Sequence, residues 1–214
     1  MTEHDLPDGS PTVVHVVEDD ALEREATARF LEAASYEVRT YPTADDFLRA
    51  APRCGCVVLD LHLPGTSGLD LQRALLESDE PLPVVFLTGC GEVRDSVQAM
   101  KAGAVDFLNK SADGSVLLDA ISRASACGTR QRAERARQRE LRGRYERLSP
   151  RERDVFAHLI SGQLNKQVGF DLGISLQTTK VHRHRVLEKM EADSIAHLVR
   201  MAAVLDIDPV GSVR

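Results

Sequence analysis

Side chains that could do chemistry together follow short strand-like runs in the first half of the chain. Glu18 and Asp19 follow one run, and Asp60, Thr88 and Lys110 each stand after a later run. Clustered carboxylates repel one another unless a cation lies between them, and ligands that are all oxygen favour a hard ion such as Mg²⁺. A carboxylate there could attack phosphorus, and an ammonium and a hydroxyl could then bind the phosphoryl oxygens. This set therefore predicts reversible phosphorylation of an aspartate.

Five short runs are expected to form the strands that bring these groups together. They cover residues 13–17, 36–41, 56–59, 82–87 and 104–108. Apolar strands that alternate with helices are typical of a parallel sheet covered on both faces. We therefore predict an α/β doubly wound fold with a five-stranded parallel sheet. Because ligands of such sheets bind at the carboxyl ends of the strands, the reactive groups should share one crevice. The expected helices cover residues 21–34, 44–50, 68–77, 92–102 and a stretch from about residue 114.

Charge is divided unevenly along the chain. Residues 1–122 contain 22 Asp and Glu against 9 Lys and Arg, a net charge of −13, whereas residues 123–214 carry +7 within a total of −6. This division predicts one part that handles cations or phosphate and another that meets a polyanion, although chance clustering on two solvated surfaces would give the same counts. No apolar run is long enough to span a bilayer, and the acidic N-terminus does not resemble a secretory signal. We expect a cytoplasmic protein that does not bind membranes.

Residues 12–122 resemble a receiver domain of two-component response regulators, which has a flavodoxin-like fold. The matching stretches are Val16–Asp20, Leu59–Gly65 with Gly68, Val85–Gly89 and Ala102–Lys110. The resemblance implies that Asp60 is the phosphoacceptor. It also implies a Mg²⁺ site, a switch pair and a phosphate-contacting cation, formed respectively by Glu18, Asp19, Asp60 and the backbone carbonyl of His62, by Thr88 and Phe107, and by Lys110.

Two positions depart from the receiver pattern. Glu18 stands where many relatives have Asp, and its longer side chain can still reach metal-bound water. Ser111 follows Lys110 where the family usually has Pro in a cis peptide. A cis bond before a residue other than Pro costs about 3–4 kcal/mol, so we predict a trans bond. Lys110 would then be held less rigidly, which predicts weaker or shorter-lived phosphorylation.

The second half of the chain has a helical pattern throughout. Residues 128–147 contain eight Arg and three Glu, which favours a solvated helical connector, with a flexible linker as the alternative. Ser149 and Ser175 are expected to cap two of four later helices, which are predicted over about 150–161, 164–172, 176–191 and 194–205. In the third helix Thr179, His182, Val186 and Met190 would pack inward. The opposite face suits a DNA major groove, although a solvated amphipathic helix would show the same pattern.

Residues 146–205 are similar to a LuxR/FixJ-type DNA-binding domain with a helix-turn-helix. The similarity is carried by Leu148–Glu152, Gly162, Asn165–Val168, Leu172–Ser175 and Thr178–Arg185. Gly169 and Thr179 stand where Ala and Val are common, which predicts a somewhat soft domain. The residues expected to contact DNA are Asn165, Lys166, Thr178, Lys180, Val181, His184 and Arg185.

The four cysteines match no common zinc spacing. Cys54 and Cys56 are expected on one strand with their side chains on the same face. Buried free thiols in a reducing cytosol are the expected state, and Cys90 as a redox-sensitive thiol beside the crevice is the alternative.

These observations predict a response regulator that acts as a transcription factor and not as an enzyme. A sensor histidine kinase would phosphorylate Asp60, and the resulting homodimer would bind promoter DNA and act on RNA polymerase. The alternatives are a phosphorylation-independent DNA-binding regulator with a degenerate receiver and an Asp-nucleophile phosphohydrolase, whose Asp-x-Asp-x-Thr motif is missing after the first strand. The expected divisions are an N-terminal tail (1–11), a receiver (12–125), an Arg-rich helical linker (126–145), a DNA-binding domain (146–207) and a C-terminal tail (208–214).

Overall fold

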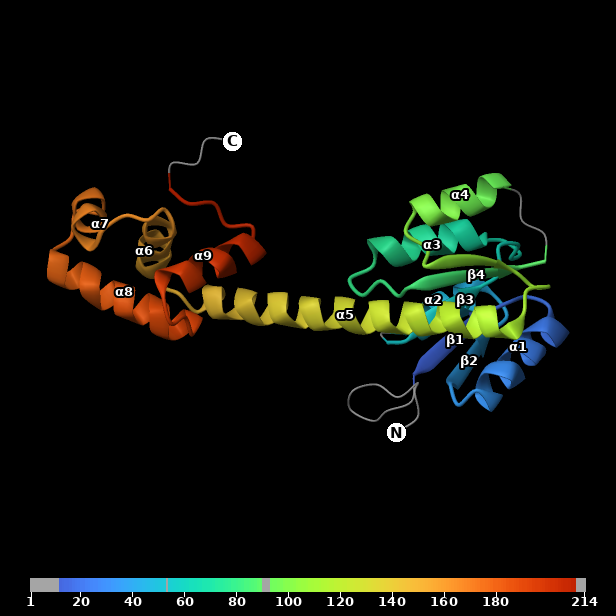
Figure 1. Cartoon of the computed structure of the whole chain (residues 1–214). Coiled ribbons are helices and arrows are strands. Elements are labelled where there is room, and N and C mark those ends of the chain that lie inside the picture. The colour runs from blue at the N-terminus through green and yellow to red at the C-terminus, as the bar shows by residue number, and fades with distance from the viewer. Residues whose placement is uncertain (1–11, 53, 90–92, 211–214) are drawn as a thin grey trace. The chain divides into compact units, whose positions relative to one another are not determined.

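A computed structural model describes residues 12–210 apart from 53 and 90–92. The chain divides into two compact units, Met1–Arg132 and Ala133–Arg214, and the boundary falls inside one long helix (Figure 1). We describe each unit by itself. None of the helices in the described part of the chain is both long enough and apolar enough to cross a membrane.

The first unit contains the five-stranded parallel sheet that the sequence predicts. Its strand order is β2-β1-β3-β4-β5, so the chain reverses its winding direction beside β1. Helices α1 and α5 cover one face of the sheet and α2, α3 and α4 cover the other (Figure 1). The elements are β1 (Val13–Val17), α1 (Ala21–Ala33), β2 (Glu37–Tyr41), α2 (Ala44–Ala50), β3 (Cys56–Leu59), α3 (Gly68–Glu77), β4 (Val84–Thr88), α4 (Val93–Lys101), β5 (Asp106–Asn109) and α5 (Gly114–Glu146).

Two hydrophobic cores lie on the two faces of this sheet. Val14 and Val58 point into the core with α1 and α5, whereas Val57 and Phe86 point into the core with α2, α3 and α4. Successive side chains of a strand face opposite sides of the sheet, so a strand that is covered on both sides must be apolar at every position. This requirement explains the uninterrupted apolar run of β3 and the four valines of β1, which flank the buried His15.

Several predicted boundaries differ from the structure. β4 begins at Val84 instead of residue 82, and β5 covers Asp106–Asn109 instead of 104–108. The backbone N–H of Ala104 closes the end of α4 by donating to Ala99, so it is not available to the sheet. The placement of Cys54 on the same strand as Cys56 was wrong, because β3 begins at Cys56.

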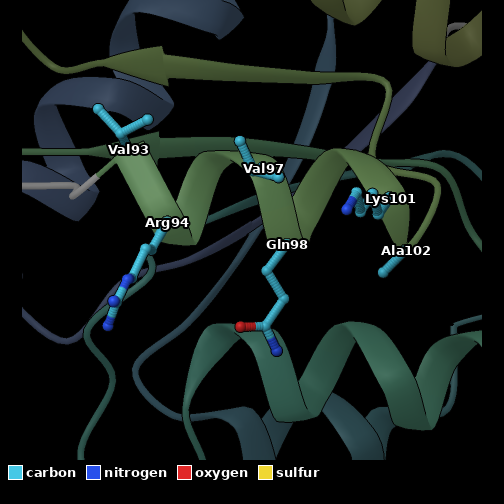
Figure 2. A pocket seen from close by; sticks show the side chains of 6 residues that line it. All are labelled: Val93, Arg94, Val97, Gln98, Lys101 and Ala102. Atoms are coloured by element: carbon cyan, nitrogen blue, oxygen red, sulfur yellow. The ribbon is translucent and has the colours of Figure 1, made fainter.

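Helix α4 presents apolar side chains to solvent. Val93, Val97 and Met100 are exposed by 80%, 47% and 46%. Val93 and Val97 lie along a shallow groove on this helix, and Gln98 points toward α3 (Figure 2). Apolar side chains that gather on a surface in this way mark a candidate contact region.

The second unit is helical and has one hydrophobic core. Phe156, Leu159, Met190 and Leu198 are almost completely buried in it. Leu141 from the last turns of α5 belongs to the same core, so the end of the Arg-rich stretch packs as part of this unit. Its other helices are α6 (Pro150–Ile160), α7 (Asn165–Asp171), α8 (Leu176–Met190) and α9 (Ile195–Val204).

Side-chain caps begin α6 and α8 where the sequence predicts. Ser149 forms a capping box with Glu152 at the start of α6, and Ser175 accepts the backbone N–H of Thr178 at the start of α8. Gly162 and Gly173 follow α6 and α7 with positive φ angles of 81° and 65°, which residues with a side chain rarely adopt. These caps set the short turns that hold α7 against α8.

Candidate phosphorylation site and nucleic-acid interface

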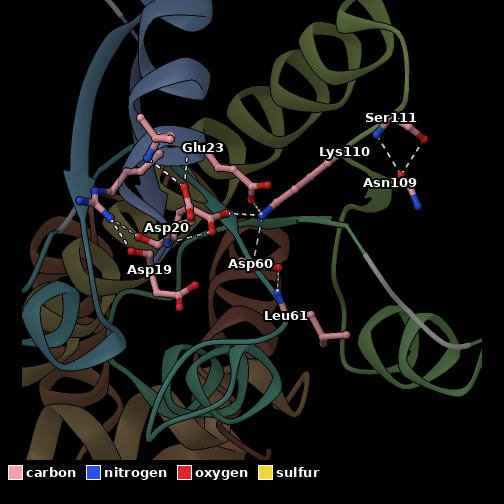
Figure 3. Close-up of polar contacts among 11 residues, drawn as sticks. Asp19, Asp20, Glu23, Asp60, Leu61, Asn109, Lys110 and Ser111 are labelled. Atoms are coloured by element: carbon pink, nitrogen blue, oxygen red, sulfur yellow. Dashed lines mark hydrogen bonds and ion pairs between the residues drawn. The ribbon is translucent and has the colours of Figure 1, made fainter.

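The predicted acidic crevice lies at the carboxyl ends of β1 and β3. One carboxylate oxygen from each of Glu18, Asp19 and Asp60 lies within 4.8 Å of the other two (Figure 3). Glu18 and Asp60 are buried, at 5% and 7% exposure, whereas Asp19 faces solvent. Three oxygen ligands open to water on one side fit a Mg²⁺ ion, which keeps part of its water shell.

Lys110 supplies a positive charge inside this crevice. Its Nζ lies 2.7 Å from Glu18 Oε2 and 3.4 Å from Asp60 Oδ2, and it also contacts the carboxylate of Glu23 (Figure 3). Its backbone N–H donates to the Thr88 carbonyl at 2.9 Å, which ties it to β4. Burial lowers the pKa of Lys110, but the carboxylates of Glu18 and Glu23 outweigh burial and raise it. Lys110 therefore carries its charge at every physiological pH.

Glu18 is held by its surroundings as well as by Lys110. Burial raises the pKa of its carboxyl, and the hydrogen bond from Lys110 opposes that rise. The backbone N–H of Asp20 donates to Glu18 Oε1 at 3.3 Å. From α1, the Arg24 guanidinium donates to the backbone carbonyls of Glu18 at 2.7 Å and Asp19 at 3.0 Å. These bonds fix the loop after β1 in a form that presents its carboxylates to the crevice.

Asp60 is oriented by its own loop. The backbone N–H of Leu61 donates to Asp60 Oδ1 at 2.7 Å, which leaves Oδ2 on the Lys110 side. A Cβ on Gly68 would lie 2.3 Å from the Asp60 carbonyl oxygen, so only glycine lets α3 begin this close to Asp60. His62, whose carbonyl the sequence assigns to the metal, lies in this loop with an exposed side chain.

The predicted switch residues lie on neighbouring strands at the same edge. Thr88 ends β4 and is 1% exposed. It pairs with Asn109 in the register between β4 and β5. Phe107 on β5 is half-buried, and its ring centroid lies 5.7 Å from that of Phe86. Thr88, Phe107 and Lys110 are therefore held by the same pair of hydrogen-bonded strands, β4 and β5.

The segment after Lys110 has the predicted trans geometry, since no peptide bond among the described residues is cis. Asn109 Oδ1 accepts the backbone N–H of Ser111 at 2.9 Å and its hydroxyl at 2.7 Å. The Asn109 carbonyl also accepts the backbone N–H of Ala112 at 2.8 Å. A hydrogen-bonded turn therefore anchors the chain where most receivers use a proline.

Sequence reasoning missed two residues at this site. Glu23 and Arg24 lie in the first turn of α1, where Asp20 caps the helix through the backbone N–H groups of Leu22 and Glu23 at 2.9 Å. Their proximity to Asp19 was the available signal. Only the position of α1 on the sheet shows that Glu23 and Arg24 face the crevice whereas Leu22 is 78% exposed.

The predicted division of α8 into two faces is confirmed for its core positions. Thr179, Val186 and Met190 are fully buried, and His182 is half-buried. The predicted contact residues on this helix are exposed: Thr178, Lys180, Val181, His184 and Arg185.

The start of α7 carries the remaining predicted contact residues. Lys166 is exposed, and Asn165 Oδ1 accepts a hydrogen bond from Arg183 at 3.1 Å, which ties α7 to α8. A Cβ on Gly169 would lie 3.0 Å from both Ile174 O and Thr179 Oγ1. The two departures from the family pattern, Gly169 and Thr179, are thus neighbours at the α7–α8 contact.

The cysteines in the described part of the chain are free thiols, as predicted, but the prediction that they are buried is wrong for Cys54 and Cys127, which are partly exposed. Cys56 is buried, and burial raises the pKa of its thiol to about 11. A thiol in this state is a packing group and not a nucleophile. Cys90 lies outside the described residues.

Comparison with known protein families matches both halves of the chain. The model described as a response regulator receiver domain matches residues 14–122, and that of bacterial regulatory proteins of the luxR family matches residues 146–202. The chain belongs to the response regulators with a LuxR-type DNA-binding domain. Its fold and its two functional modules are therefore those of a transcription regulator in a two-component system.

Full-length relatives share both modules. The chain is 40% identical to the response regulator protein TodT of Pseudomonas putida over 192 residues, which cover 89% of this chain and 85% of TodT. It is also 40% identical to the transcriptional regulatory protein FixJ of Rhizobium meliloti over 191 residues, covering 88% and 94% of the two chains. Among solved structures, the response regulator StyR matches with a TM-score of 0.79 at 38% identity, covering 90% of this chain and 98% of StyR.

Proposed function

We propose that Asp60 accepts a phosphoryl group from the phosphohistidine of a sensor kinase. A carboxylate oxygen of Asp60 would attack phosphorus and form a P–O bond, while the P–N bond to the imidazole breaks and the released imidazole keeps the electron pair and takes up a proton. The observation that carries this proposal is the placement of Asp60 beside Lys110 and two further carboxylates. The chain would catalyse its own phosphorylation and hydrolysis without acting on another substrate.

Glu18, Asp19, Asp60 and the backbone carbonyl of His62 would hold Mg²⁺. The three carboxylates fit a hard cation because every side-chain donor is oxygen and two of the three are buried. When bound, the ion would offset the charge of the phosphoryl oxygens. Lys110 would bind a phosphoryl oxygen from the opposite side through its ammonium group.

Thr88 and Phe107 would transmit the effect of phosphorylation from the crevice to the surface of the domain. The Thr88 hydroxyl would move toward the new anion, and Phe107 would rotate into the space that Thr88 leaves. The contact of Phe107 with Phe86 supports this role because the ring already packs in the core beneath β4 and β5. The surface formed by α4 and β5 would then change.

The exposed apolar side chains of α4 support dimerisation through that surface. We propose that phosphorylation favours a homodimer, which would space two copies of α8 for two DNA half-sites. Sedimentation with and without beryllofluoride, a phosphoryl mimic, tests this step. A larger dimer fraction with the mimic is expected, and V97E, which places a charge on the α4 groove, should reduce it. An equal dimer fraction in both conditions would favour a phosphorylation-independent regulator.

The exposed face of α8 would enter the major groove of promoter DNA. Lys180 and Arg185 would contact guanine or phosphate, Val181 a thymine methyl group, and Asn165 and Lys166 the phosphate backbone. The exposure of the basic side chains supports this assignment. Thr178 and His184 complete the proposed contact set.

The remaining assignments follow from these two modules. We propose that the DNA-bound dimer acts on RNA polymerase and that the protein works in the cytoplasm. We also propose a receiver over 12–125, a helical connector over 126–145 and a DNA-binding domain over 146–207, flanked by tails at 1–11 and 208–214. The end of the connector contributes Leu141 to the DNA-binding core. A fragment that begins at residue 146 lacks Leu141 and should therefore expose part of that core.

Substitution of Asp60 tests the phosphoacceptor. D60N should abolish both labelling by a small phosphodonor and beryllofluoride binding in the presence of Mg²⁺. D45N, at an exposed position in α2, is the matched control and should behave like the unsubstituted protein. Labelling that persists in D60N would show that another residue accepts the phosphoryl group.

Substitution of Lys180 tests the DNA interface. K180A should weaken operator binding at fixed salt, and it should lower the salt dependence by about one counterion if Lys180 contacts a phosphate. R49A removes one exposed positive charge from α2, which belongs to neither proposed interface, and serves as the control. Unchanged operator affinity in K180A would remove Lys180 from the interface.

A further inference from the structure

Lys110 has a third ion-pair partner that neither the metal site nor the phosphoacceptor requires. Glu23, in the first turn of α1, contacts the Lys110 ammonium together with Glu18 and Asp60 (Figure 3). The Glu23 side chain is 51% exposed, whereas the side chain of Lys110 is 19% exposed. Glu23 is therefore the outer partner of an otherwise enclosed cation.

The two glutamates draw the ammonium away from Asp60. A lysine ammonium has three N–H donors, and its three carboxylate partners use all of them. The distance to Asp60 Oδ2 is 3.4 Å, against 2.7 Å to Glu18 Oε2, so Asp60 receives the weakest of the contacts. A phosphoryl group on Asp60 needs the same donors, and it would meet an ammonium that Glu23 already holds.

We propose that Glu23 is a brake that competes with the phosphoryl group for Lys110. This inference rests on the proposed phosphorylation of Asp60 and adds a residue that tunes it. In the unphosphorylated protein the Glu23 carboxylate satisfies Lys110. Phosphorylation requires Lys110 to turn inward, which breaks or weakens the contact with Glu23. Removing the charge of Glu23 therefore frees Lys110 for the anion.

Beryllofluoride binding at fixed Mg²⁺ measures this competition without a kinase. The chain has no Trp, so calorimetry or fluorine NMR is the suitable readout. E23Q should bind beryllofluoride about two- to fivefold more tightly, which is the range expected for a partly exposed ion pair. The difference should shrink toward zero at high salt because a partly exposed pair is screened.

Glu25 provides the matched control on the same helix. It pairs with Arg29 at the surface and has 58% side-chain exposure, so E25Q removes the same charge without touching Lys110. Tighter binding by E23Q alone supports the proposal. Equal tightening by E23Q and E25Q would reveal a bulk charge effect and overturn the brake, as would unchanged or weaker binding by E23Q.

Beryllofluoride binding by the D60N variant distinguishes failure of this inference from failure of the proposed function. If D60N fails to bind beryllofluoride and E23Q binds like the unsubstituted protein, only the brake is refuted. If D60N still binds the mimic, the phosphoacceptor assignment and the brake fail together. The side chain of Glu23 is half exposed. The Asp20 side chain caps α1 by accepting the backbone N–H groups of Leu22 and Glu23, so the cap does not use the Glu23 side chain, and E23Q leaves the fold of α1 intact.

Discussion

An ion pair between Glu152 and Lys189 joins the first turn of α6 to the last turn of α8, the proposed recognition helix. Lys189 Nζ lies 2.6 Å from Glu152 Oε2, and the two side chains differ in exposure, at 37% and 3%. The same oxygen accepts the backbone N–H of Ser149 at 2.8 Å. Burial raises the pKa of Glu152, but Lys189 and Ser149 outweigh it, so the pKa is lowered. The pair should therefore stabilise the DNA-binding unit.

Removing Lys189 and removing the charge of Glu152 should lower the stability of the unit by different amounts. K189M leaves a buried carboxylate without a counter-charge, which costs about 3–5 kcal/mol when burial is complete; water at the Lys189 side reduces our expectation to about 2–3 kcal/mol. E152Q leaves Lys189 near the surface, 3.3 Å from the Arg147 carbonyl, and should cost about 1 kcal/mol. The double variant E152Q/K189M should cost less than the two single changes together, with a coupling of about 1–2 kcal/mol.

Hydrogen exchange read by mass spectrometry can measure these costs in α6 and α8 separately from the sheet. K166M, at an exposed lysine of the same unit, is the control and should leave exchange unchanged. The native pKa of Glu152 is below its unfolded value, so its contribution is complete above the unfolded pKa of 4.5 and is lost as the pH falls through the native pKa. The contribution of Glu152 to the stability of the unsubstituted unit should therefore decline only below about pH 4.5.

Two results would refute this reasoning. If E152Q destabilises α6 and α8 as much as K189M does, the asymmetry in burial does not control the energetics. If the double variant costs the sum of the single changes, Glu152 and Lys189 act independently, and their proximity contributes nothing to the stability of the unit.

Three further changes test local packing, with G68A and H15L in the first unit and G143A in the second. G68A forces a Cβ to within 2.3 Å of the Asp60 carbonyl oxygen, so it should destabilise the domain by more than about 2 kcal/mol and weaken beryllofluoride binding. A Cβ at Gly143 would meet no atom within 4 Å, so G143A should stabilise α5 by about 0.5–1 kcal/mol. Urea unfolding measures both changes, and equal effects would contradict the expected clash at Gly68. Burial lowers the pKa of His15, whose Nε2 lies 2.9 Å from the Cys54 carbonyl. The His15 imidazole therefore takes up a proton less readily in the native state than in the unfolded state. Stability should fall as the pH drops below about 6.5, by at most about 1.4 kcal/mol per pH unit, until the pH reaches the native pKa of His15. Urea titrations across this range should show a flatter slope in H15L, and an identical slope would exclude His15 as the cause.

Much of the fold could be predicted because its signals are local. Runs that are apolar at every position predict strands covered on both faces, and Ser149 with Glu152 predicts the start of α6 through hydrogen bonds within one turn. The parallel sheet then places all carboxyl ends at one edge. This is why Asp60 and Lys110, 50 residues apart in the chain, could be assigned to one crevice before their contact was known.

The strand boundaries were less predictable because they depend on competing hydrogen bonds. Ala104 looks like a strand residue, yet its N–H bonds to Ala99 at the end of α4. Ser111 could be identified as a departure from the family. The turn that Asn109 forms around it depends on where β5 leaves the sheet, and residue types alone do not determine that position.

The residue types and their spacing determined the chemistry of this protein: carboxylates for a cation, a lysine for an anion and a basic helix for nucleic acid. Only the tertiary structure decided how the charges are shared. Lys110 comes from the loop after β5, Glu18 from the end of β1 and Glu23 from α1, and their contact depends on how α1 packs against the sheet. A charge responds to every group within a few ångströms, whatever its distance along the chain, so the balance among these partners can be read only from their positions in space.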